Sequence, residues 1–112
     1  MIKQNFLLLT ELPTISPFSF DSEIESGRDA QLVCYVAKGD TPVSILWYFH
    51  GREVSHVMGV NTMKVGGRSN ILTISSATHG HSGQYTCVAS NAAGEARHSA
   101  TLVVHGMVFF AP

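Results

Sequence analysis

Hydrophobic and polar residues alternate with a period of two along much of the middle of this chain. The clearest run is residues 29–37, where every second side chain is apolar or small. This period is that of a β-strand, and turn sequences rich in Gly, Pro, Asp and Asn separate the runs. We therefore predict an all-β protein with strands at 13–20, 22–26, 29–37, 45–49, 61–65, 68–75, 84–90 and 95–104, and a further short strand after residue 53.

Four residues in the middle of the chain keep a characteristic order and spacing. Trp47 lies 13 positions after Cys34, and Tyr85 lies two positions before Cys87. In an immunoglobulin-type sandwich such cysteines bridge the two sheets, the tryptophan packs on the bridge, and the tyrosine caps the turn before the second cysteine. We predict this fold, two antiparallel sheets joined by one disulfide, with Leu72 also in the core. Buried free thiols are the alternative, but the spacing favours the bridge and an oxidising compartment.

Composition fits a single folded domain. The 112 residues are 45% hydrophobic and 13% charged, with a net charge of −1. These values argue against disorder and against a nucleic-acid surface based on bulk positive charge. We predict an immunoglobulin-like domain at 12–105, a leader remnant or a splicing- or cloning-derived extension at 1–11, and an extension or linker at 106–112.

No residue pattern points to catalysis. His79 and His81 are close in sequence, but a zinc site needs three or four converging ligands and no third lies at suitable spacing. The chain has no nucleophile elbow, and Gly66 and Gly67 lack the lysine of a phosphate-binding loop. We predict a non-enzymatic domain with no catalytic residues, metal or cofactor. No Asn-x-Ser/Thr acceptor is present, so no N-glycan is predicted on either sheet face.

Several positions predicted to face outward are apolar, where a water-exposed sheet face is normally polar. Because Cys34 points inward, its strand presents Gln31, Val33, Tyr35 and Ala37 outward, and the strand at 68–75 adds Ile71 and Thr73. These strands are B and E of the immunoglobulin sheet that also contains A (13–20) and D (61–65). A clustered apolar set predicts a protein contact, although scattered exposed apolar residues are also normal.

The opposite sheet and the charges leave further alternatives open. Leu46, Tyr48 and Val88 are predicted to face outward there, either as a second contact or beneath the segment after residue 53. Acidic residues crowd positions 11–29, whereas Lys64 and Arg68 lie near strands D and E. In an antiparallel two-fold pair these charges could meet and set register, or they could be solvated surface charges.

Two parts of the sequence resemble I-set immunoglobulin domains of cell-adhesion proteins. LTI at 72–74 and SGQYTCVASNAAGE at 82–95 carry the general likeness. PFSF at 17–20, Gly27, VC at 33–34, KGDTP at 38–42 and ILW at 45–47 resemble the Dscam (Down syndrome cell adhesion molecule) family. The likeness is strongest to its variable seventh domain in arthropods and to the first domain of shortened chelicerate forms. Most I-set domains have Asp, bridged to Arg, where this chain has His81, so that bridge is expected to be absent or replaced.

The resemblance implies an extracellular domain of a single-pass, alternatively spliced cell-surface protein of neuronal or immune recognition. It implies isoform-specific binding to an identical copy in trans, antiparallel through the A-B-E-D sheet. No nucleic-acid partner is expected, and membrane contact only through the parent protein's transmembrane segment. The expected contact residues are the anchors Val33, Tyr35 and Ile71, ringed by Gln31, Thr73, Met63, Lys64 and Glu25.

Two alternative functions remain. A heterophilic or immune-type receptor would bind through the loops, but the loop at 91–94 is short and lacks the aromatic residues of a typical paratope. A structural spacer domain would have no partner, and the apolar face of strands B and E argues against it.

Overall fold

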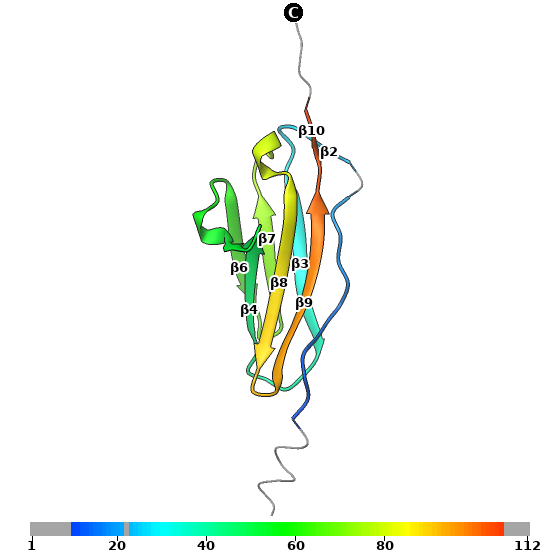
Figure 1. Cartoon of the computed structure of the whole chain (residues 1–112), viewed down its shortest axis with the longest axis vertical. Helices are drawn as coiled ribbons and strands as arrows, with labels where there is room; N and C mark the ends of the chain where they lie inside the picture. The colour runs from blue at the N-terminus through cyan, green and yellow to red at the C-terminus, as the bar shows by residue number, and fades with distance from the viewer. Residues whose placement is uncertain (1–9, 22, 107–112) are drawn as a thin grey trace, which may run out of the picture.

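The computed structural model describes residues 10–21 and 23–106. They form two four-stranded antiparallel sheets that stack face to face (Figure 1). The predicted extensions at 1–11 and 106–112 fall largely outside the described residues. One sheet has the order β1 (Thr14–Ile15), β3 (Ala30–Lys38), β7 (Ser69–Ile74) and β6 (Val60–Val65), and the other has β5 (Arg52–Glu53), β4 (Ser44–Phe49), β8 (Gly83–Asn91) and β9 (Gly94–Leu102).

Three short elements complete the fold beyond these two sheets. β10 (Val104–His105) pairs in parallel with β2 (Ile24–Glu25). β2 contains only two residues of the strand predicted at 22–26. The short strand predicted after residue 53 is wrong: the strand β5 ends at Glu53, and the chain continues through a 3₁₀ turn, η1 (Val54–His56), into β6. A second 3₁₀ turn, η2 (His79–His81), precedes β8.

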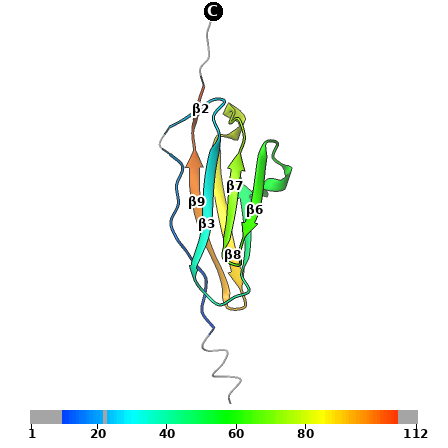
Figure 2. The same cartoon turned by 180° about the vertical axis from the view of Figure 1, so that it is seen from behind.

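The alternation that predicted the strand at 29–37 is visible in β3. Buried and exposed side chains follow one another strictly from Ala30 to Ala37. Figure 2 shows β3, β7 and β6 side by side on the rear of the view in Figure 1, with one face of their sheet open to solvent. The strand period therefore separates a core face from a free face, as an antiparallel sheet with one covered side requires.

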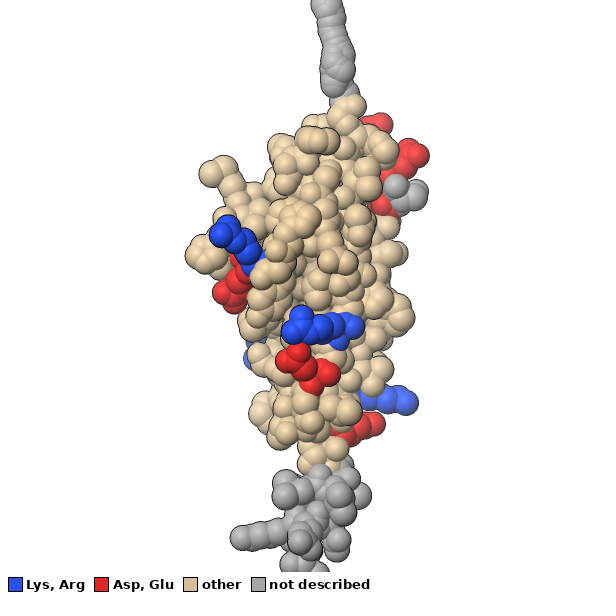
Figure 3. Space-filling view, viewed as in Figure 1, with Lys and Arg blue, Asp and Glu red and all other residues tan. Residues whose placement is uncertain are grey.

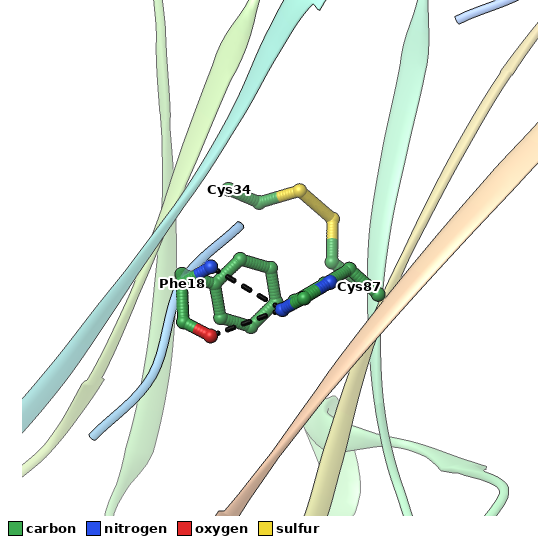
Figure 4. Close-up of a disulfide and its surroundings, with 4 residues drawn as sticks. Phe18, Cys34 and Cys87 are labelled. Atoms are coloured by element: carbon green, nitrogen blue, oxygen red, sulfur yellow. Dashed lines mark hydrogen bonds between the residues drawn. A yellow bond between two sulfur atoms is a disulfide. The ribbon is translucent and has the colours of Figure 1, made fainter. Parts of the chain in front are cut away.

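The core is built around the disulfide. Cys34 on β3 and Cys87 on β8 are bonded, with their Cα atoms 6.4 Å apart, and both are fully buried. Trp47 is 2% exposed and pairs with Cys87 in the register of β4 and β8. Phe18 lies beside the bridge (Figure 4), with its ring edge-on to Trp47 at a centroid distance of 5.3 Å. Closing a loop of 53 residues stabilises the fold by about 4 kcal/mol on the chain-entropy account.

A histidine from β9 holds the segment that carries Phe18. Nε2 of His98 lies 3.0 Å from the carbonyl oxygen of Phe18 and 3.3 Å from its amide nitrogen. The two rings are also edge-on at 4.4 Å. This short stretch between β1 and β2 is therefore fixed over the sandwich edge without regular strand pairing.

The prediction for the outer face of the second sheet needs one correction. Leu46 is 42% exposed, but Val88, in the same cross-strand row with Arg97, is only 8% exposed. Val88 lies on the central strand β8, where both neighbouring strands shield it. Val88 is therefore too buried to meet a partner, whereas Leu46 is exposed.

Candidate recognition surface

The outer face of the β1-β3-β7-β6 sheet carries a row of apolar side chains across three strands. The register pairs Val33 on β3 with Ile71 on β7, and Ile71 with Met63 on β6. Val33 is 40% exposed and Met63 is 61% exposed, while Ile71 between them is half-buried. Since all three leave the sheet on the same side, they form a continuous apolar strip open to solvent.

The next row extends this strip at one end. Tyr35 on β3 pairs with Ser69 on β7, which pairs with Val65 on β6. Tyr35 and Val65 are each 45% exposed. We define the apolar patch as Val33, Tyr35, Met63, Val65 and Ile71. Val65 is absent from the residues predicted from sequence, although its spacing of two from Met63 would have indicated it.

A polar row borders the opposite end of the patch. Gln31 on β3, Thr73 on β7 and Asn61 on β6 are paired in register and face the same side. Gln31 and Asn61 are exposed, and Thr73 is half-buried. Hydrogen-bonding side chains therefore lie directly beside the apolar strip, where they would fix the register of any partner that covers it.

Two predicted contact residues lie outside this face. Lys64 pairs with Asn70, which pairs with the inward-facing Cys34, so the Lys64 side chain leaves β6 on the side away from the patch. Glu25 belongs to β2, which pairs with β10 and not with the sheet that carries the patch. Either residue could meet a partner only from the margin of the patch.

Charge is distributed unevenly along the axis of this sheet. Near β2 and the start of β3, acidic side chains line a hollow of about 310 Å³: Asp21, Glu23, Glu25 and Asp29, with Arg28 among them. Beyond the other end of the patch lie Lys38, at the end of β3, and Arg68, just before β7. Arg68 turns toward the chain and donates to the carbonyl oxygens of Val36 and Gly39 at 3.1 and 2.7 Å. Glu11 and Asp40 lie at the same end, where Asp40 accepts from the Glu11 amide and Glu11 accepts from the Gly39 amide. The patch thus lies between an acidic end and an end that carries charges of both signs.

The opposite sheet offers a less continuous surface. Leu46 is exposed and Tyr48 half-buried on its outer face. Arg97 and Glu95 form an ion pair of 3.0 Å on β9. Figure 3 shows that charged side chains on this face are few and separated by wide uncharged areas. A single exposed leucine with partly covered neighbours is a weaker basis for a contact than the five-residue patch.

His81 occupies the position at the base of the sandwich where most I-set domains have aspartate, and it makes a different set of contacts. Its Nδ1 accepts a hydrogen bond from the Thr78 amide at 2.9 Å, and its Nε2 lies 2.8 Å from the carbonyl oxygen of Met58, to which it donates. The ring is 7% exposed. The predicted loss of the Asp–Arg bridge is therefore accompanied by a histidine link from η2 to the segment before β6.

Tyr85 completes this corner of the fold. Its hydroxyl donates to the carbonyl oxygen of His81 at 2.7 Å, and its side chain is fully buried. Burial raises the pKa of the Tyr85 hydroxyl above its usual value, because the ionised form would lose hydration. The group is therefore a structural donor, in agreement with the role that its spacing from Cys87 predicts.

The described residues contain neither a candidate metal site nor a membrane-spanning helix. Within residues 10–21 and 23–106, no three His, Cys, Asp or Glu side chains come together as a possible metal site. Both ring nitrogens of His81 are occupied by backbone partners, which removes it from the His79–His81 pair considered above. The same part of the chain contains no helix long and apolar enough to cross a membrane.

Comparison with known proteins places the chain in a family. A family profile described as "Immunoglobulin domain" matches residues 13–91. The cell adhesion molecule Dscam2 of Drosophila melanogaster is 37% identical over 92 residues, and human cell adhesion molecule DSCAM is 35% identical over 92 residues. Each alignment covers 82% of this chain and 4% of the relative, so the chain spans a small fraction of these adhesion molecules.

A solved single domain is matched over nearly its full length. The crystal structure of the Dscam1 Ig7 domain, isoform 5, is 32% identical, with a TM-score of 0.80, over 83% of this chain and 96% of that domain. The two backbones share one fold, and the fold class predicted from Cys34, Trp47, Tyr85 and Cys87 is confirmed. This chain belongs to the immunoglobulin domain family, within the non-enzymatic domains of Dscam-type cell adhesion molecules.

Proposed function

We propose that this domain is an extracellular recognition module that binds a second, identical copy through the apolar patch. The pairing would be two-fold and antiparallel, between molecules on apposed cells, and specific for the isoform. The membrane would be reached only through the transmembrane segment of the parent protein. The adhesion role of the Dscam relatives supports this proposal.

The observation that carries the proposal is the continuity of the apolar patch. Val33, Ile71 and Met63 form one cross-strand row, and Tyr35 and Val65 extend it, with four of the five between 40% and 61% exposed. Contiguous exposed apolar patches rimmed by polar residues mark protein contacts in many proteins. Tyr35 is the strongest anchor, since tyrosine combines large contact area with a polar end.

A two-fold arrangement agrees with the charges. In an isologous pair the same surface meets itself, so an antiparallel orientation brings the acidic end of one copy toward the end of the other that carries Lys38 and Arg68 together with Glu11 and Asp40. The acidic end is lined by Glu25 and Asp29 among others, and Lys38 and Arg68 lie beyond the other end. A parallel orientation would place the two acidic ends together, which electrostatic complementarity disfavours.

Isoform specificity would come from the margin of the patch. The polar row of Gln31, Thr73 and Asn61 lies beside the apolar strip. In a pair of unlike copies these groups would face side chains that do not satisfy their hydrogen bonds, and buried unpaired polar groups are costly. Substitutions in this row should therefore change partner choice more than fold stability.

The test is sedimentation equilibrium of the whole chain and two matched variants. Tyr35→Asp places a charge in the patch, whereas Tyr48→Asp places the same charge on the outer face of the other sheet. We expect the wild type and Tyr48→Asp to dimerise and Tyr35→Asp to remain monomeric. A wild type that is monomeric at the highest concentration, or a Tyr35→Asp variant that dimerises as strongly, would refute the proposal.

A further inference from the structure

The symmetry of a self-pair limits which side chains of the two copies can meet. In a face-to-face pair with antiparallel strands, the two-fold axis lies between the sheets and runs across the strands. This operation keeps each strand over its own counterpart and reverses the order of residues along it. β3, β7 and β6 of one copy therefore meet β3, β7 and β6 of the other (Figure 2). Only the height of the axis along the strands is left open.

The outward side chains of these strands form three complete rows. We call them the polar row (Gln31, Thr73 and Asn61), the middle row (Val33, Ile71 and Met63) and the tyrosine row (Tyr35, Ser69 and Val65). β6 ends at Val65 and β7 begins at Ser69, so a turn lies beyond the tyrosine row. At the other end β7 stops at Ile74, one residue after the polar row. No further row of the described residues crosses all three strands.

The middle row is the height at which the two copies cover each other most fully. An axis there lays all three rows of one copy over the three rows of the other. The apolar side chains of the middle row then face their own counterparts and lose contact with water. An axis on either outer row would move the other two rows past the ends of β6 and β7, and the middle row would lie over connecting loops.

The two outer rows have matching chemistry, as this crossing requires. On the central strand β7, Thr73 would face Ser69 of the other copy, and both are half-buried hydroxyl residues. On β3, the Gln31 amide would face the Tyr35 hydroxyl, so one can donate to the other. On the outermost strand, β6, Asn61 would face Val65, and both are exposed. The mismatched pair therefore lies at the margin, where water can satisfy the amide.

We propose that the two-fold axis of the self-pair passes through the middle row, so that Thr73 of each copy contacts Ser69 of the other and Gln31 contacts Tyr35. Each contact occurs twice, so a change at either position acts twice on the affinity. Ser69 thereby becomes a specificity residue that the sequence did not indicate. This inference rests on the proposed function, but it can fail alone, because two copies could also cover the patch at another height.

The test places charges on the two positions of β7 that are expected to meet. In Thr73→Lys/Ser69→Glu, opposite charges face each other if the axis lies on the middle row. With the axis on an outer row, Thr73→Lys would face itself or Ser69→Glu would face itself. In Thr73→Lys/Ser69→Lys and Thr73→Glu/Ser69→Glu, like charges meet at all three heights. Sedimentation equilibrium of each whole chain at low salt measures the association, because low salt screens these charges least.

We expect the opposite-charge variant to dimerise at least about tenfold more tightly than either like-charge variant. An equimolar mixture of the two like-charge variants should associate more tightly than either variant alone. The control Thr86→Lys/Ser99→Glu makes the same substitutions on the outer face of the other sheet, where the two hydroxyl oxygens are 2.7 Å apart. This control should dimerise like the wild type.

Single cysteines give a second measurement that changes the surface little and does not depend on the charged variants folding. Thr73→Cys and Ser69→Cys chains of different mass are treated with a short bis-maleimide, separately and mixed. The facing backbones of two packed sheets are about 10 Å apart, which such a linker can span. We expect cross-linked pairs that contain one chain of each kind. Cross-linking of either variant mainly to itself would put the axis on its own row and overturn the proposal.

The failure of this inference differs from that of the self-recognition. An opposite-charge variant as monomeric as the like-charge variants, in a chain whose wild type dimerises, would overturn the proposed axis and leave the self-recognition intact. Equal association of all three charged variants would also overturn it, because these side chains would then lie outside the contact. A wild type that stays monomeric would refute the self-recognition itself, and the axis with it.

Discussion

The histidine link at the base of the sandwich allows a sharp stability prediction. His81 is buried and joins two backbone groups, the Thr78 amide and the Met58 carbonyl. Substitution by alanine removes the packing of the buried ring and both hydrogen bonds. With a net loss of about 1.5 kcal/mol for each, His81→Ala should lower the free energy of unfolding by about 3 kcal/mol.

Two near-isosteric variants separate the two bonds. In His81→Asn the amide oxygen can take the place of Nδ1 and keep the bond from Thr78, while the bond to Met58 is lost. In His81→Gln the amide nitrogen can take the place of Nε2 and keep the bond to Met58. Each should cost about 1.5 kcal/mol, half the cost of alanine.

The aspartate common in related domains should be worse here than asparagine. His81→Asp matches asparagine in size, but it would bring a buried carboxylate toward the Met58 carbonyl, which is also an acceptor. A buried charge without a paired cation is strongly unfavourable. We therefore expect His81→Asp to unfold more easily than His81→Asn at pH 7.

Urea unfolding followed by Trp47 fluorescence measures these differences. The protein concentration is kept low enough for the domain to be monomeric, and equal slopes across the variants show that the midpoints report stability. A His81→Asp variant as stable as the wild type, or a loss of less than about 1 kcal/mol in His81→Ala, would contradict this prediction. Either result would mean that the histidine link adds little to the fold.

Three further predictions concern the core and the start of the domain. Burial raises the pKa of the Tyr85 hydroxyl in the folded state, so the contribution of Tyr85 to stability is complete below about pH 10 and is lost as the pH rises further. Urea midpoints between about pH 9 and 11 should therefore fall more steeply for the wild type than for Tyr85→Phe. Reducing the Cys34–Cys87 bond should lower the free energy of unfolding by about 4 kcal/mol, and an unchanged urea midpoint in dithiothreitol would contradict the loop-entropy argument. Asn91 donates to the carbonyl oxygens of Glu11 and Asp40 and accepts from two amides of its own hairpin. Asn91→Asp should therefore keep the hairpin but release Glu11. We expect faster cleavage by protease near residue 11, while the amide spectrum of the hairpin stays close to that of the wild type.

Much of the fold could be predicted from the sequence because its strongest signals are local. The alternation in β3 comes from a strand with one buried face, and the spacing of Cys34, Trp47 and Cys87 comes from their meeting in one layer of the core. The outward positions Val33 and Tyr35 follow directly from that alternation. These features depend on strand geometry and burial, which a single sequence records well.

The faces of the side chains on the edge strand β6 could not be predicted from the sequence. In β6 every residue after Val60 is exposed, so no hydrophobic alternation fixes which side chains share a face. The register with β7 places Met63 and Val65 on the patch and Lys64 on the opposite face of the sheet, whereas the sequence suggested Met63 and Lys64 together. Adjacent residues of a strand cannot both project from one face.

Long-range contacts account for the other differences. The bond from His81 to Met58 joins residues 23 positions apart, and neither residue type signals the other in the sequence. Val88 was predicted to be open because its strand phase points outward, yet its neighbours on β4 and β9 cover it. Burial on an outer face depends on the size of the cross-strand neighbours, and the register of the strands decides which residues those neighbours are.

Methyl NMR during dilution is the sharpest test of the proposal that a second copy covers the apolar patch. We expect the methyl signals of Val33, Met63, Val65 and Ile71 to shift together as the whole chain is diluted from millimolar to micromolar concentration. The methyl signals of Leu46 on the other sheet and of Met58, which is 91% exposed, should stay fixed. Patch methyl signals that do not move with concentration, or equal movement at Leu46, would contradict it.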